Sequence, residues 1–128
     1  MLYNKINIHS ELSIILRSIT KMITNEILKN IKHVHFIGIG GSGMYPLVQI
    51  FHSKGYFITG SDNNETETLE AVRKLGIGVF LGQRAENIKG ADLIIYTAAI
   101  MADNPELIAR ESIACAMLIC KGKRCNLL

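Results

Sequence analysis

The stretch His35-Phe36-Ile37-Gly38-Ile39-Gly40-Gly41-Ser42-Gly43-Met44 joins a short apolar run to a cluster of glycines. The apolar run, residues 33–37, is rich in β-branched and aromatic side chains, which is typical of a buried strand. Residues 42–54 then carry apolar side chains at three- and four-residue spacing, which predicts a helix that ends at Gly55. The glycines therefore form a turn between a strand and a helix.

The residues that follow repeat this alternation. The pattern predicts further strands at 56–59, 79–81, 93–96 and within 113–119, and helices at 64–75 and 104–110. Asn64 and Glu67 have the spacing of a capping box, and Pro105 suits the first turn of a helix. Strands that alternate with helices at this spacing predict an α/β fold: a Rossmann-like parallel sheet of four to five strands with flanking helices.

The two ends of the chain differ from this body, which we assign to residues 33–119. Apolar residues between Leu12 and Ile27 recur at helical spacing, so residues 1–32 are predicted to form a helical extension. Residues 120–128 show no such pattern and are predicted to be an irregular tail.

Composition excludes several classes of protein. The chain has 128 residues, of which 48% are hydrophobic and 20% charged, so it is not intrinsically disordered. No apolar run approaches the roughly twenty residues of a membrane span, so no membrane partner is expected. Residues 33–112 carry nine acidic and six basic side chains, and this acidic body argues against a nucleic-acid partner. Cys115, Cys120 and Cys125 match no zinc or redox spacing; we interpret them as buried or incidental thiols in a cytoplasmic protein.

The glycine turn satisfies G-x-G-x-x-G in the strand–turn–helix context that this motif requires. Gly38 permits the tight turn, Gly40 lets the backbone approach a diphosphate, and Gly43 allows the helix to pack closely on the strand. The N–H groups at the start of the helix, with the Ser42 hydroxyl, would then bind the anion. The alternative is a tight turn that binds nothing.

Two further segments follow predicted strands. Asp62 lies 24 residues after Gly38, where a Rossmann fold places the acid that accepts hydrogen bonds from a ribose. An aspartate before two asparagines is equally suited to cap a turn or a helix. Thr97-Ala98-Ala99 leaves a strand at its carboxyl end, the side where open α/β sheets bind ligands. Its small side chains leave room for a ligand, although a tightly packed loop would need them as well.

No catalytic or metal site is predicted. His33 and His35 point to the same face of one strand but have no acidic or cysteine partner at metal-ligand spacing, so we interpret them as packing or surface residues. No nucleophile can be paired with a base.

The glycine stretch resembles the opening of the Mur ligases, and the resemblance continues through several motifs in order. These are Gly55-Tyr56, Gly60-Ser61-Asp62, Ala85-Glu86-Asn87, Gly90-Ala91-Asp92, Thr97-Ala98-Ala99-Ile100 and Asn104-Pro105-Glu106-Leu107. The resemblance covers about residues 33–112. Tyr45-Pro46 departs from it, because small residues are expected there, and so does the stretch after Glu111.

This resemblance implies the N-terminal domain of a ligase that joins L-alanine to UDP-N-acetylmuramate with ATP and Mg²⁺ in peptidoglycan synthesis. The first of three domains would bind UDP-N-acetylmuramate or UDP; the missing domains would hold ATP and Mg²⁺, so this chain alone would have no cofactor and no activity. The implied binding residues are Gly38, Gly40, Gly41, Ser42, Gly43, Met44, Asp62, Thr97, Ala98 and Ala99. A coenzyme-binding fragment of an NAD-dependent oxidoreductase or a dinucleotide sensor is the alternative, because the glycine turn and Asp62 suit it equally well. A fragment that binds no nucleotide and serves only structure or interaction is the third.

Overall fold

The computed structural model describes residue 17 and residues 29–41, 43–113, 115–121 and 124–127. The predicted apolar helix of the extension lies outside these ranges apart from residue 17, and so does Ser42. Among the described residues, no helix is long and apolar enough to cross a membrane.

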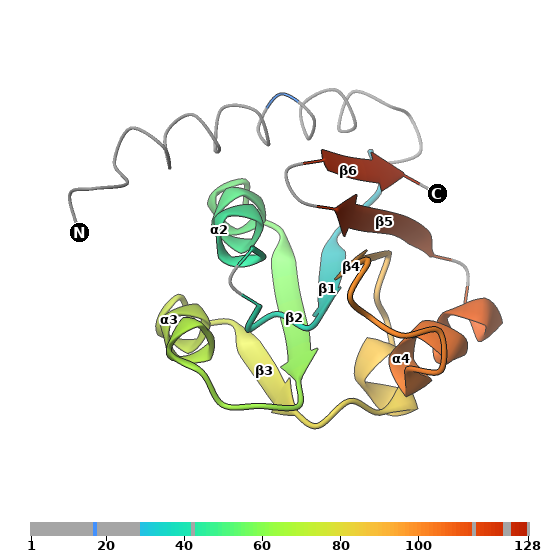
Figure 1. Ribbon diagram of the computed structural model, residues 1–128. Helices are drawn as coiled ribbons and strands as arrows, with labels where there is room; N and C mark the ends of the chain where they lie inside the picture. The colour runs from blue at the N-terminus through green and yellow to red at the C-terminus, as the bar shows by residue number, and fades with distance from the viewer. Residues whose placement is uncertain (1–16, 18–28, 42, 114, 122–123, 128) are drawn as a thin grey trace.

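Six strands and three α-helices make up the described part of the chain (Figure 1). In chain order these are β1 (His33–Ile37), α2 (Tyr45–Ser53), β2 (Phe57–Asp62), α3 (Glu67–Lys74), β3 (Gly78–Leu81), β4 (Leu93–Thr97), α4 (Pro105–Ala109), β5 (Ala116–Lys121) and β6 (Arg124–Leu127). Two 3-10 helices, η3 (Ala85–Ile88) and η4 (Arg110–Ser112), precede β4 and β5.

The strands form one sheet in the order β3-β2-β1-β4-β5-β6. The first five strands are parallel to one another, which confirms the predicted α/β fold, and β6 is antiparallel to β5. The chain moves outward from β1 to β3, returns across the sheet to β4, and continues outward on the other side. The strand order therefore reverses at the seam between β1 and β4.

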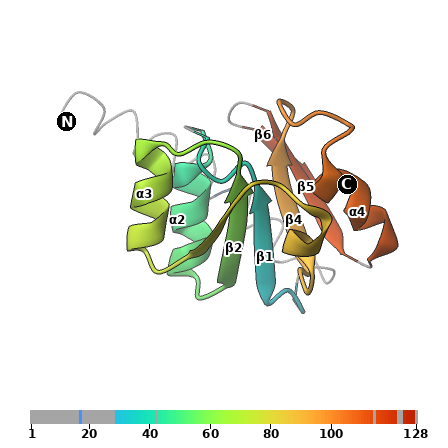
Figure 2. The ribbon, with the colours of Figure 1, turned by 90° about the horizontal axis from the view of Figure 1, so that it is seen from below.

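Helices cover both faces of the sheet, α2 and α3 on one side and α4 with η3 on the other (Figure 2). Alternate residues of β1 face opposite layers: Val34 and Phe36 pack in the cluster under α2 and α3, and Ile37 packs in the cluster that includes Ile88 of η3. Both clusters are buried, as expected for a parallel sheet between helices.

Gly60 in the middle of β2 is needed for one close contact. A Cβ on Gly60 would lie 2.6 Å from Cβ and 2.8 Å from Cγ2 of Ile39, which is fully buried. Ile39 belongs to the glycine loop after β1, so the loop is packed directly on the neighbouring strand.

The end of the chain differs from the prediction of an irregular tail. Cys120 belongs to β5 and residues 124–127 form β6, which adds a sixth strand to the four or five expected. The antiparallel register places Cys120 opposite Cys125, and the two form a disulfide with 4.1 Å between their Cα atoms. The interpretation of these two residues as thiols is therefore wrong, because cross-strand pairing, and not sequence spacing, brings them together.

Helix starts follow the sequence in one case and differ in another. Pro105 lies in the first turn of α4 as expected, and Asn104 caps this helix, since its Oδ1 accepts hydrogen bonds from the N–H groups of Glu106 and Leu107 at 2.9 and 3.4 Å. The cap of α3 is Thr66, whose Oγ1 accepts from Leu69 N at 3.1 Å. The predicted cap at Asn64 is therefore two residues too early.

Candidate functional site

The glycine loop leaves the carboxyl end of β1 and is fastened to β2 by backbone hydrogen bonds. The N–H groups of Gly38 and Ile39 both donate to the carbonyl of Ser61, at 2.8 and 2.9 Å. Gly38 has a φ of +80°, a left-handed conformation that favours glycine, and this explains the tight turn predicted at the first position of the motif. Gly41 N donates back to the Gly38 carbonyl at 3.1 Å.

The second glycine of the motif faces Asp62. A Cβ on Gly40 would lie 2.8 Å from Asp62 Oδ2, and Gly40 N donates to the same oxygen at 2.9 Å. The absence of a side chain at Gly40 lets the Asp62 carboxylate approach the backbone of the loop. The approach of a diphosphate to this backbone stays a prediction.

Asp62 serves as a cap for two turns. Its Oδ1 accepts a hydrogen bond from Asn64 N at 3.1 Å, while Oδ2 holds Gly40 N. Of the two roles that the sequence left open, the structure shows the capping role. A carboxylate has about four acceptor positions, so these two bonds still leave acceptor capacity for a ribose.

Gly43, the third glycine, differs from the motif's usual use. It is exposed, and a Cβ there would meet no atom within 4 Å. The predicted close packing of helix on strand at this position is therefore wrong. Helix α2 begins at Tyr45, and its N-cap, Met44, makes no side-chain capping bond, whereas Thr66 and Asn104 cap α3 and α4. Among the described residues the start of α2 thus has no side-chain cap beside the glycine loop, and such an N-terminus attracts anions.

The turn after β4 lies beside the glycine loop at the β1–β4 seam. Thr97 Oγ1 accepts from Ala99 N at 3.3 Å, and Ala98 N donates to the carbonyl of Cys120 at 3.1 Å. Ile100 reaches across the seam, because a Cβ on Gly38 would lie 3.3 Å from its Cδ1. The structure therefore brings both predicted loops to one edge of the sheet, the carboxyl edge, at the point where the strand order reverses. Ligands of open α/β sheets bind at such a point.

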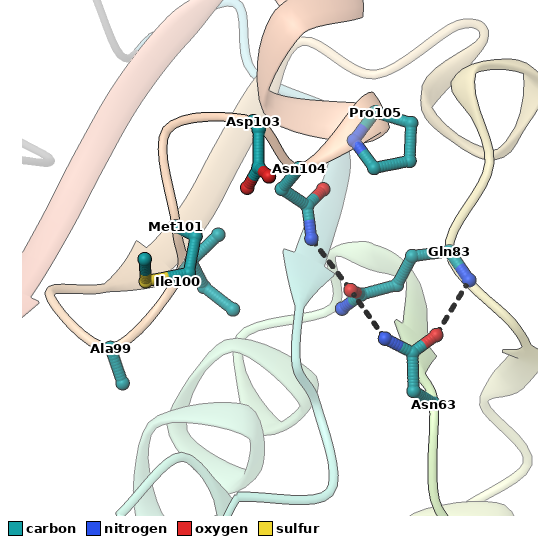
Figure 3. A pocket seen from close by; sticks show the side chains of 8 residues that line it. All are labelled: Asn63, Gln83, Ala99, Ile100, Met101, Asp103, Asn104 and Pro105. Carbon is teal, nitrogen blue, oxygen red and sulfur yellow. Dashed lines mark hydrogen bonds between the residues drawn. The ribbon is translucent and has the colours of Figure 1, made fainter.

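A pocket of about 430 Å³ opens at the same edge (Figure 3). Its lining comes from the segments that follow β2, β3 and β4 and consists of Asn63, Gln83, Ala99, Ile100, Met101, Asp103, Asn104 and Pro105. Gln83 Oε1 accepts from Asn104 Nδ2 at 2.6 Å and from Asn63 Nδ2 at 3.1 Å, as the dashed lines in Figure 3 show. Three amide side chains beside an apolar wall suit a ligand that is planar and polar at its edge.

The sequence did not indicate most of this pocket. Of the residues predicted to bind a ligand, Ala99 alone is among those that line this pocket. Asn63 follows β2 directly and Gln83 follows β3 within two residues, so both lie where a parallel strand ends. That position is the signal that would have found them.

A buried polar cluster lies behind the pocket on the face covered by α4 and η3. Its centre is Glu106, which is fully buried and whose Oε1 lies 2.6 Å from Nε2 of the equally buried His35. His35 Nδ1 in turn lies 2.8 Å from Thr59 Oγ1, which also lies 2.7 Å from His33 Nε2. His35 is a packing residue, as predicted, but one that is hydrogen-bonded on both ring nitrogens.

Ionisable groups away from this edge have shifted pKa values of a structural kind. Backbone N–H groups of His33 and Lys32 donate to Asp92 at 2.9 and 3.0 Å and lower the pKa of its carboxyl. Burial lowers the pKa of His33 and raises that of the Cys115 thiol, which disfavours the reactive thiolate. Among the described residues, no group of three or more His, Cys, Asp or Glu side chains could hold a metal ion.

The comparison with known proteins decides the family. A family model described as "Mur ligase family, catalytic domain" matches residues 33–117. The chain belongs to the Mur ligase family. Its match runs from β1 into β5 and contains the glycine loop, Asp62 and the turn at 97–99. The hairpin partner β6 lies beyond it.

Two relatives of this Mur ligase chain are both named as ligases of UDP-N-acetylmuramate and alanine. The UDP-N-acetylmuramate–L-alanine ligase of Legionella pneumophila (strain Corby) is 45% identical over 83 residues, which cover 65% of this chain and 18% of the relative. The crystal structure of the UDP-N-acetylmuramate-alanine ligase of Thermotoga maritima has a TM-score of 0.61 and 40% identity, covering 65% of this chain and 19% of that one. This Mur ligase chain therefore spans about a fifth of the length of the relatives it matches.

The fold extends beyond the family. Shikimate dehydrogenase from Aquifex aeolicus has a TM-score of 0.63 but only 14% identity, covering 85% of this chain and 41% of that one. Such a likeness concerns the fold alone.

Proposed function

We propose that this chain is the substrate-binding domain of a UDP-N-acetylmuramate–L-alanine ligase and that it binds the UDP part of UDP-N-acetylmuramate. The observation that carries the proposal is the position of the glycine loop at the β1–β4 seam, within the segment that matches the Mur ligase family. The identity of the proposed substrate comes from the names of the two relatives described above.

In this proposal the diphosphate lies over the loop of residues 38–44, beside the start of α2. The helix end offers backbone N–H groups and the positive end of the helix dipole to two phosphate groups. The nucleoside extends toward the pocket at Asn63 and Gln83, where amide groups can pair with its polar edge. Asp62 sits between the two regions and can accept a further bond from the ribose.

ATP and Mg²⁺ belong to the complete ligase in this proposal. The described residues do not fit the metal, since they contain no cluster of three acidic, histidine or cysteine side chains. No catalytic step is therefore assigned to this chain, which binds substrate while other parts of a ligase supply the ATP chemistry. The proposed location of the chain is the cytoplasm, because its proposed ligand is a nucleotide-bearing precursor of peptidoglycan.

The test is a thermal-shift titration of the 128-residue chain with UDP-N-acetylmuramate, UDP and NAD in parallel. A ligand at about 100 times its Kd adds roughly 2.7 kcal/mol to the free energy of unfolding, which raises the Tm by several degrees. The proposal predicts a shift with both uridine compounds and none with NAD. A shift with NAD alone would replace it by the oxidoreductase alternative, and no shift with any of the three would refute nucleotide binding.

A further inference from the structure

Glu106 is a charged side chain in an unexpected place. It lies in the first turn of α4, a five-residue helix, yet its exposed fraction is 0%. A carboxylate is costly to bury unless hydrogen bonds replace its water. The structure supplies these bonds from several parts of the chain.

Four groups surround the two carboxylate oxygens. Oε1 lies 2.6 Å from His35 Nε2 and accepts from the Ser61 hydroxyl at 2.8 Å. Oε2 accepts from Asn87 Nδ2 at 3.0 Å and from Arg84 N at 3.2 Å. One side chain of α4 thus joins β1, β2, η3 and the loop that precedes η3.

Two of these bonds hold the wall of the pocket. Asn87 Nδ2 also donates to the carbonyl of Gly82 at 2.9 Å, so the residues on both sides of Gln83 are tied to the same carboxylate, Gly82 through Asn87 and Arg84 through its own N–H. Asn104, which caps α4 two residues before Glu106, meets Gln83 at 2.6 Å. Glu106 therefore fixes Gln83 and Asn104 relative to each other from behind.

We propose that Glu106 is a positioning residue for the nucleotide pocket: it touches no ligand, but holds Gln83 and Asn104 at the spacing in which their amide groups bind one. The inference rests on the proposed function for the identity of the ligand. Its physical basis is preorganisation, because a wall that is already fixed loses little conformational freedom when the ligand binds.

A merely structural role would have a different consequence. Removal of Glu106 would then lower the free energy of unfolding, while every molecule that still folds would keep the affinity of the parent. A positioning role requires that the folded variant binds more weakly. The experiment must therefore separate stability from affinity.

Glutamine is the conservative replacement at this site. Its oxygen can accept from Arg84 N and Asn87 Nδ2, while its amide group donates to His35 Nε2 and the Ser61 hydroxyl oxygen, because a neutral histidine can present either ring nitrogen as acceptor. Glu106→Gln therefore keeps all four contacts. Glu106→Ala loses them together.

We would measure UDP binding by calorimetry for the 128-residue parent, Glu106→Ala, Glu106→Gln and Val72→Ala, at a temperature where circular dichroism shows each to be folded. Val72 is fully buried in α3, on the opposite face of the sheet, and serves as the matched control for lost stability. Glu106→Ala is expected to raise the Kd about tenfold or more, the size of one lost buried hydrogen bond, and Glu106→Gln by less than about threefold. Val72→Ala should keep the parent's Kd despite a lower Tm.

A second readout needs no ligand. The side-chain amide signals of Gln83 and Asn104 in a two-dimensional NMR spectrum report whether these groups are held in one arrangement. They are expected to be separate and sharp in the parent and in Glu106→Gln, and to merge or broaden in Glu106→Ala. If the parent binds no UDP, the proposed function fails, and these signals still decide the positioning role.

Parent-like affinity of folded Glu106→Ala would overturn the inference, and so would unchanged Gln83 and Asn104 signals. Should Glu106→Ala not fold, Asn87→Ala tests the same connection from the other end. It removes the hydrogen bonds that Asn87 Nδ2 donates to the Gly82 carbonyl and to Glu106 Oε2. It is expected to raise the Kd several-fold relative to Val72→Ala. An affinity equal to that of this control would refute the role of Glu106.

Discussion

The contact between Gly40 and Asp62 predicts a strong difference between two glycines of one motif. In Gly40→Ala the new Cβ would lie 2.8 Å from Asp62 Oδ2, closer than real Cβ contacts, and 3.1 Å from Thr66 Oγ1, which is tighter than most of them. In Gly43→Ala the new Cβ would have no neighbour within 4 Å. Neither glycine has a positive φ, so backbone strain does not complicate the comparison.

The cost of Gly40→Ala follows from the bonds that must give way. A shift of Asp62 to ordinary contact distance breaks its bond to Gly40 N, now 2.9 Å, and a hydrogen bond to a charged group contributes about 1.5–3 kcal/mol. Displacement of Thr66 weakens the cap of α3 by up to about 1 kcal/mol. The smaller entropy of unfolded alanine offsets about 0.4–1 kcal/mol. We therefore expect a net loss of roughly 0.5–3.5 kcal/mol for Gly40→Ala and less than about 0.5 kcal/mol for Gly43→Ala.

A double-mutant cycle assigns this loss to the contact. Urea unfolding, followed by circular dichroism, would be measured for Gly40→Ala, Asp62→Ala, the double variant and Gly43→Ala. Asp62→Ala alone loses the bonds to Gly40 N and Asn64 N, so it also destabilises the chain. Because the alanine at 40 no longer meets a carboxylate in the double variant, its loss should be smaller than the two single losses together by about 1–2 kcal/mol. Additive losses, or equal losses at Gly40 and Gly43, would refute this explanation of the motif.

Two further predictions concern the sheet and its amino edge. Gly60→Ala should lower the free energy of unfolding in urea by about 2 kcal/mol or more, because the new Cβ would overlap Ile39 in the packed core. Gly78→Ala, at the first residue of β3 with open space beside it, is the control. An equal loss in both variants would contradict the overlap. Asp92→Asn tests pH dependence: backbone bonds from His33 and Lys32 hold the pKa of Asp92 below 3.8, so its contribution is present above that value and is lost as the pH falls through the folded pKa. The Tm of the parent should therefore exceed that of Asp92→Asn at pH 7, and the difference should shrink as the pH falls through the folded pKa of Asp92. A difference independent of pH would show that the charge has no part in it.

The parallel sheet could be predicted because each strand and helix carries its own local pattern. The run at 33–37 and the glycines after it suffice for β1 and its turn, and Pro105 suffices for the start of α4. The hairpin of β5 and β6 carries no comparable pattern, since residues 124–127 are mixed in polarity. These residues form a strand because they pair with β5, and the pairing cannot be read from their own sequence.

The candidate site was predictable only in part. The loop and the turn after β4 were found because a motif and a strand end mark them. Gln83 and Asn104 were not, because they come together from separate loops. Glu106 is the clearest case: a charged residue on a short helix is expected at the surface, but this one is buried where His35, 71 residues earlier, and three further groups bond its carboxylate.

The strand order also bears on how the chain folds. Most neighbouring strands pair over short stretches of sequence: His33 with Phe57 joins β1 to β2, and Leu93 with Ala116 joins β4 to β5. The pairing of Val34 with Leu93 must instead close a loop of nearly sixty residues, which has the larger entropic cost. We expect two half-sheets to form early and the β1–β4 seam to join them last. The glycine loop meets the turn after β4 across this seam, so the proposed ligand-binding edge would be completed only in the final step of folding, and a ligand bound there would hold the two halves together.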